Sequence, residues 1–126
     1  MSSAAVWNHN QLLNRFDDDK SLVADLMEFY IKETEGLLAK LNVALAADSS
    51  KDVCSIAHAL KGQAATVFLD KVRLAAHALE EAILDGMMHL ITPLYNELRS
   101  ALEEAIEVVS CWLEGADFEE CLTKKA

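Results

Sequence analysis

The chain has 126 residues, and 11 Lys and Arg against 21 Asp and Glu give it a formal charge of −10. This length suits one domain with a single core. The acidity disfavours binding to a phosphate backbone, which needs Lys and Arg, so we expect no nucleic acid as a partner. No apolar run approaches the roughly 20 residues that span a bilayer, and the start lacks the pattern of a signal peptide.

The pattern of apolar residues indicates the fold class. One proline and four glycines interrupt the chain, and nearly all of the apolar pattern has a helical period, which predicts an all-α fold. The three cysteines, Cys54, Cys111 and Cys121, form no C-x-x-C pair and are odd in number. They indicate neither a disulfide framework nor a zinc knuckle. We therefore expect a reducing, cytoplasmic location.

The first elements in chain order are a loose start and a short helix. Residues 1–10 are expected to be loose, and Asn8 or Asn10 can cap a short helix that covers one end of a bundle. Three aspartates at 17–19 end this helix and offer an N-cap to a long helix over 21–47. The residues expected to face inward on the long helix are Leu22, Leu26, Phe29, Leu37, Leu41 and Leu45.

Two shorter helices follow. Ser49 and Asp52 resemble a capping box and start a helix that should end near residues 67–68. Asp70 is predicted to cap the next helix, and Gly86 is predicted to end it. The inward positions expected on the first of these helices are Val53, Ile56, Leu60, Ala64 and Val67.

A final long helix completes the pattern. Thr92 is its predicted N-cap, Pro93 its first residue, and Gly115 its end. Four helices with short connections predict an antiparallel up-down-up-down four-helix bundle over residues 11–114, with the short N-terminal helix as a cap. Two readings stay open for the tail, residues 115–126, which is either frayed or folded back on the bundle. The residues able to fold back are Phe118 and Leu122.

One stretch, IAHALKGQAATVFL over residues 56–69, is not explained by packing alone. If Ile56 and Leu60 point inward, His58 lies about 200° from both, and its imidazole points outward. The face around it lacks long side chains and includes a glycine, which costs about 1 kcal/mol relative to alanine in mid-helix. A face this bare indicates that another surface comes close to the histidine. The small residues on this face are Cys54, Ser55, Gly62 and Ala65.

An outward histidine has three readings. It is a surface residue without a role, a metal ligand together with Cys54 at spacing i, i+4, or a nucleophile. No further ligands lie at a convincing spacing, which disfavours the metal. Taken singly, Lys61 is a solvated lysine and Gly62 a close helix contact. Together with His58 they favour the nucleophile, because Lys61 can balance phosphoryl oxygens and Gly62 clears the approach.

The string AHALKGQAAT at residues 57–66 resembles the signature of the histidine-containing phosphotransfer (HPt) domain, H-x-[LIF]-K-G-[SQ]-[AS]-[AG]. The resemblance extends from about Leu12 to Leu113. It implies a four-helix bundle with the histidine exposed on a middle helix. It also implies a phosphoryl carrier without kinase activity, which exchanges phosphoryl groups with response-regulator receiver domains or a hybrid sensor kinase. No cofactor is implied in this chain, since the receiver is expected to bring Mg²⁺.

The resemblance also implies roles for single residues. His58 is the phosphoacceptor, Lys61 the cation that faces the phosphate, and Gly62 the clearance position. Gln63 is interpreted as a polar contact at the edge of the site. Glu80, on the next helix, either holds the other imidazole nitrogen and fixes its tautomer or is an ordinary surface acid. The residues expected under the docked partner are Cys54, Ser55 and Ala65, and those interpreted as bystanders are His9, His77 and His89.

Several positions depart from the family pattern. Ala65 and Phe68 stand where many members carry glycines, and Phe68 is interpreted as a core residue. Two rival functions stay open: a helical docking or dimerisation module without transfer, and a metal-binding bundle enzyme, which the missing Glu-x-x-His pairs disfavour. We expect a monomer that binds neither nucleic acid nor membrane. The initiating Met1 favours a free-standing protein over a piece of a hybrid kinase.

Overall fold

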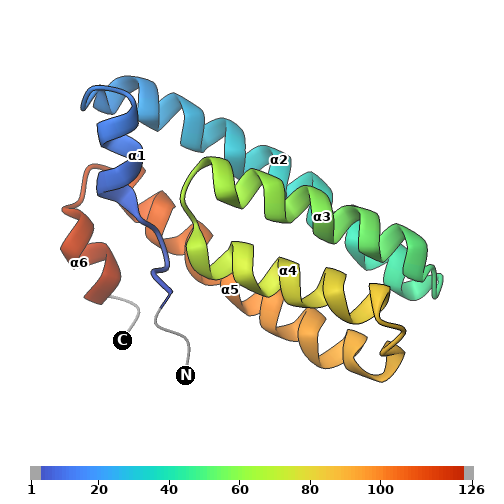
Figure 1. The fold of residues 1–126 in the computed structure, drawn as a ribbon. Coiled ribbons are helices and arrows are strands. Elements are labelled where there is room, and N and C mark those ends of the chain that lie inside the picture. The colour runs from blue at the N-terminus through green and yellow to red at the C-terminus, as the bar shows by residue number, and fades with distance from the viewer. Residues whose placement is uncertain (1–3, 124–126) are drawn as a thin grey trace.

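A computed structural model describes residues 4–123, and every regular element in that range is a helix (Figure 1). The prediction of an all-α fold is confirmed. The elements in chain order are α1 (His9–Arg15), α2 (Lys20–Ala46), α3 (Ser50–Thr66), α4 (Asp70–Leu84), the short 3-10 helix η1 (Met88–Leu90), α5 (Ile91–Leu113) and α6 (Phe118–Thr123).

Helices α2 to α5 form the bundle. Consecutive helices pack side by side, with α3 between α2 and α4, and contacts between α2 and α5 close the ring (Figure 1). Helices α1 and α6 lie together at one end. Side-chain caps start two of the helices: the Asp19 carboxylate accepts from the Leu22 N–H at 3.1 Å, and the Ser49 hydroxyl accepts from the Asp52 N–H at 3.4 Å. None of the described helices is long and apolar enough to cross a membrane.

Two of the predicted caps are wrong. Helix α4 begins at Asp70 itself with Leu69 at the N-cap, and the Asp70 carboxylate accepts a hydrogen bond from the side chain of Asn8 at 3.2 Å. Helix α5 begins at Ile91, not at Pro93, because η1 leads directly into it. Pro93 lies in the first turn, where its missing N–H costs no intrahelical hydrogen bond.

The core register of α2 differs from the prediction. Leu22 and Phe29, predicted to face inward, are 47% and 63% exposed. Apolar residues occupy more than one stripe of this helix, so the period alone leaves two registers open, and packing selects the one shifted by about a residue in the first half of α2. Leu41, also predicted to face inward, is fully buried. The buried residues of α2 are Val23, Met27, Tyr30, Thr34, Leu41 and Ala44.

The N-terminal segment is packed, which corrects the expectation of a loose start for its described residues, 4–10. Trp7 is only 2% exposed, and its indole N–H donates to the Val67 carbonyl at 3.0 Å. The Asn8 N–H donates to the Phe68 carbonyl at 2.8 Å. Burial of a large indole with its N–H satisfied holds this segment against the end of α3. Residues 1–3 of the predicted loose segment lie outside the described residues.

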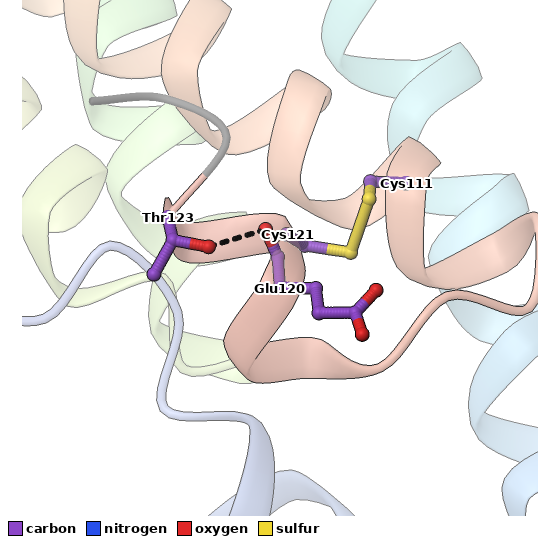
Figure 2. The surroundings of a disulfide bond; sticks show 4 residues. All are labelled: Cys111, Glu120, Cys121 and Thr123. Carbon is purple, nitrogen blue, oxygen red and sulfur yellow. Dashed lines mark hydrogen bonds between the residues drawn. A yellow bond between two sulfur atoms is a disulfide. The ribbon is translucent and has the colours of Figure 1, made fainter.

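The C-terminal segment folds back, which decides between the two readings of the tail for residues up to 123. A disulfide joins Cys111 of α5 to Cys121 of α6 (Figure 2), although the number and spacing of the cysteines indicated no disulfide framework. Helix α6 has six residues, too few to be stable alone, so contacts must hold it. These contacts form an aromatic clasp, which we define as Trp7, His9, Trp112 and Phe118.

Candidate functional site

His58 lies in the middle of α3, which α2 and α4 flank. Its neighbours Ala57 and Leu60 are fully buried, and these two anchor the helix in the core. The helical period then directs the imidazole away from the core, and the His58 side chain is 68% exposed. The outward direction expected from the apolar period is the direction that the structure has.

Glu80 of α4 holds both His58 and Lys61. One carboxylate oxygen, Oε2, lies 2.6 Å from His58 Nδ1, and the other, Oε1, lies 2.5 Å from Lys61 Nζ. The Glu80 side chain is 11% exposed, so it is no ordinary surface acid. Because an ionised carboxylate only accepts hydrogen bonds, Nδ1 carries the proton and Nε2 keeps its lone pair.

The charge of Glu80 depends on these two contacts. The hydrogen bond from Lys61 is the largest cause that lowers the pKa of Glu80, and the hydrogen bond from His58 lowers it further. Burial raises the pKa of Glu80, but the net shift is downward. The carboxyl group is therefore ionised at neutral pH and is able to hold the imidazole in one tautomer.

His77 also reaches this carboxylate, although it was interpreted as a bystander. Its Nδ1 lies 4.0 Å from Glu80 Oε1, and its Nε2 lies 3.6 Å from Glu81 Oε1. The His77 side chain is half exposed, so these pairs are weak. A signal for the contact was present in the sequence, since His77 precedes Glu80 by one helical turn and so shares its face.

Gly62 leaves open space above α3. A Cβ added to it would meet no heavy atom within 4 Å, so the alternative reading as a close helix contact is wrong. Gln63 is half-buried, and no hydrogen bond joins it to His58 in the described part of the chain; its side-chain oxygen is buried without a partner there. Ala65 is exposed. The face beside His58 is therefore open on the side of α3 where Gly62 lies.

A hollow of about 560 Å³ adjoins the histidine between α3, α4 and η1. Cys54, with a free thiol, and Ser55 line it on the α3 side. The other lining residues include Lys51, His58, Glu80, Leu84 and Met88. The structure thus brings the predicted residues Cys54 and Ser55 to one surface with His58.

In its neutral form, the His58 imidazole presents an unprotonated Nε2 to solvent, with the tautomer fixed by Glu80 and the Lys61 ammonium beside it. This arrangement suits nucleophilic attack on an electrophile carried by another molecule. Among residues 4–123, no three His, Cys, Asp or Glu side chains converge as metal ligands do.

Comparison with known families agrees with the geometry. A profile described as Hpt domain matches residues 25–109, which is more than half of the chain and includes α3 and α4. Comparison with curated proteins and with solved structures gives no match. Hpt domains in general transfer phosphoryl groups through a histidine in phosphorelays and are carriers, not kinases. The chain belongs to the Hpt domain family.

Proposed function

We propose that this chain is a histidine phosphotransfer protein that accepts a phosphoryl group on His58 from a receiver-domain aspartate and passes it to another receiver. The single observation that carries the proposal is the Glu80 carboxylate, bound to His58 Nδ1 at 2.6 Å and to Lys61 at 2.5 Å below an open helix face. A surface histidine without a role does not need a buried carboxylate that fixes its tautomer.

In the accepting step, His58 Nε2 attacks the phosphorus of the aspartyl phosphate. The bond between Nε2 and phosphorus forms, the bond between the aspartyl oxygen and phosphorus breaks, and the aspartate leaves as a carboxylate. The ring then carries a proton on Nδ1 and the phosphoryl group on Nε2, so it is positively charged. Glu80 stabilises this charge across the 2.6 Å hydrogen bond. Transfer to the next receiver reverses the same bonds.

Lys61 and Gly62 serve the incoming group. The Lys61 ammonium lies one turn from His58 and is able to exchange Glu80 for a phosphoryl oxygen, which places positive charge where negative charge arrives. Gly62 has no side chain to hinder the receiver's active-site rim. The receiver supplies the acidic pocket and the Mg²⁺ ion, so this chain needs to supply only a positioned nucleophile and leaving group.

Partners and location follow from this proposal. We infer response-regulator receivers, or the receiver of a hybrid sensor kinase, as donors and acceptors, and a monomeric carrier whose His58 face stays free between transfers. The cytoplasm is part of the proposal, and the free Cys54 thiol agrees with it. The Cys111–Cys121 disulfide is more typical of an oxidising compartment. Counting thiols in protein that is alkylated directly in acid-quenched cells decides between the two.

The test is transfer from a receiver labelled with radioactive phosphate. We expect the wild-type chain to take up label that is labile to acid and stable to base, and His58→Gln to abolish this uptake. His89→Gln is the matched control, because His89 is an exposed histidine elsewhere. If receivers bind but leave no label on the wild type, the docking-module alternative is correct. Retention of the label by His58→Gln contradicts the assignment of the phosphoacceptor.

A further inference from the structure

A hollow lies at the end of the bundle where α1 and α6 come together (Figure 1). Its volume is about 610 Å³, and small-molecule sites in proteins have volumes of about 300–1,000 Å³, apolar or aromatic walls and a few polar groups. Trp112 and Phe118 of the aromatic clasp line it. It shares no lining residue with the hollow beside His58, so it is a separate surface. We call it the clasp hollow.

The aromatic walls of the clasp hollow are cross-linked. Trp112 follows Cys111 at the end of α5, and Phe118 begins α6, which the Cys111–Cys121 disulfide joins to α5 (Figure 2). Both aromatic side chains are half-buried, so each keeps ring surface that a ligand is able to cover. Because the cross-link already holds the two walls together, less order has to be created when a ligand binds.

His9 lines the clasp hollow with an imidazole that has no partner. The residue is 9% exposed, and neither ring nitrogen makes a hydrogen bond with a described residue, although the nearby Asn10 side chain raises the pKa of His9. The net shift of this pKa is downward, mainly through burial, so the ring is neutral at neutral pH and has one donor and one acceptor. Buried polar groups are rarely left unpaired, which indicates a partner from outside the chain, either water or a ligand.

Two opposite charges complete the lining of the clasp hollow. Lys20 at the start of α2 and Asp117 just before α6 both line it. Both residues are exposed, and within residues 4–123 neither side chain forms an ion pair. The lining thus holds one cation and one anion, which match a ligand that carries both charges. An aromatic acid or an aromatic amine fits less well, because each leaves one of the two charges unpaired.

We propose that the clasp hollow binds a free aromatic amino acid. The ring of the ligand lies against Trp112 and Phe118. Its carboxylate meets Lys20, its ammonium group meets Asp117, and the same polar end gives His9 a hydrogen-bond partner. Because the ring nitrogens of His9 are closed to solvent in this structure, binding includes a shift of the Phe118 ring that stacks on the imidazole. This inference goes beyond phosphoryl transfer and does not depend on it.

The experiment compares L-phenylalanine with three compounds that each lack one of its features. The full chain is titrated by calorimetry with L-phenylalanine, with 3-phenylpropionate, which lacks the ammonium group, with phenethylamine, which lacks the carboxylate, and with L-leucine, which lacks the aromatic ring. We expect saturable binding of one L-phenylalanine and about tenfold weaker binding of the other three. Tryptophan fluorescence should change over the same concentrations, because Trp7 and Trp112 both belong to the clasp.

Three variants test the polar groups of the clasp hollow. Lys20→Gln, Asp117→Asn and His9→Phe, which keeps the ring stack, should each bind L-phenylalanine about tenfold more weakly. The matched controls are Lys32→Gln and Asp25→Asn, because both residues are exposed on α2 and neither lines the clasp hollow. Both controls should bind as the wild type does. The four changes of Lys and Asp are at exposed side chains, so these variants keep the fold.

Three results overturn the inference. The first is the absence of saturable binding of L-phenylalanine, which leaves water as the partner of His9. The second is equal affinity for any of the other three compounds, which removes the requirement for a ring and both charges. The third is wild-type affinity in any of the three variants, or binding without a change in tryptophan fluorescence, which places the ligand elsewhere on the chain.

Discussion

At the scale of single residues, Glu80 links His58, the proposed nucleophile, to Lys61. Glu80→Gln removes the charge that stabilises the phosphorylated imidazole, and the amide is able to turn its NH₂ toward Nδ1, which would move the ring proton to Nε2. We expect the rate of phosphoryl acceptance to fall about tenfold or more, which corresponds to about 1.4 kcal/mol of barrier. Rapid-quench measurement with a labelled receiver gives this rate.

Glu81→Gln is the control for that experiment, because Glu81 is the neighbouring, half-exposed acid that does not contact His58. It should transfer at the wild-type rate. A Glu80→Gln variant that folds normally by circular dichroism and also transfers at the wild-type rate would show that the tautomer is fixed by something else.

The sequence predicted part of this site and left part of it open. His58, Lys61 and Gly62 lie on one helix, where residue spacing fixes direction, so their common face could be predicted from the period. Glu80 had two readings, because it lies on a different helix from His58. The distance between their side chains depends on how the two helices pack, which the spacing of residues along the chain does not specify. The contact of His77 with the same carboxylate is different, because both residues lie on α4 one turn apart and the spacing could have predicted it.

At the scale of the helix, α3 carries a glycine that the fold does not require. Gly62→Ala adds a side chain into open space, so we expect about 0.5–1 kcal/mol more stability from helix propensity. We also expect slower phosphoryl acceptance from a receiver, because the added methyl group meets the partner. Urea unfolding and the labelled-receiver rate measure the two effects.

Gly36→Ala is the matched variant, since Gly36 is also exposed in mid-helix with open space around it, but on α2. It should gain similar stability and transfer at the wild-type rate. A Gly62→Ala variant that transfers as fast as Gly36→Ala would remove the clearance role from Gly62.

Helix ends and helix registers were predicted unequally well. The caps at Asp19 and Ser49 depend on local sequence and are present. Leu22 and Phe29 were wrongly assigned to the core. Apolar residues lie on several faces of α2, and the sequence alone does not show which face packs against the other helices. Phe68 packs partly against the core and has a φ of +62°. This left-handed conformation is strained for a residue with a Cβ, so the packing of Phe68 must offset its cost.

At the scale of the whole molecule, the two ends of the chain meet at the aromatic clasp. The bundle could be predicted, because four helix-length apolar patterns with short connections leave few arrangements. The clasp could not, because it joins Trp7 and His9 to Trp112 and Phe118 across about a hundred residues of chain. The Cys111–Cys121 disulfide likewise requires α6 to lie against α5. Neither contact has a local signal.

His9 makes the clasp sensitive to acid. Its ring stacks on Phe118 with centroids 4.4 Å apart and is 9% exposed. Burial is the main cause that lowers the pKa of His9 below 6.5, and nearby Lys20 adds to it, while Asn10 and Asp117 act in the opposite direction. In the unfolded chain His9 is protonated as the pH falls below about 6.5, whereas in the folded chain it is protonated only at a lower pH. The stability that neutral His9 provides is therefore complete above pH 6.5 and is lost as the pH falls from there through the pKa of the folded state.

We therefore expect the melting temperature to fall between pH 7 and pH 5, and His9→Phe to reduce this fall, because phenylalanine keeps the ring stack and does not titrate. Tryptophan fluorescence follows the transition at the clasp itself, since Trp7 and Trp112 are the two tryptophans of the chain and both belong to it. His89→Gln, which changes an exposed histidine, should keep the wild-type dependence on pH. Glu80, whose pKa is lowered from 4.5, loses its contribution only at more acid pH and does not interfere in this window. An equal fall in wild type and His9→Phe would mean that the clasp tolerates a charged imidazole.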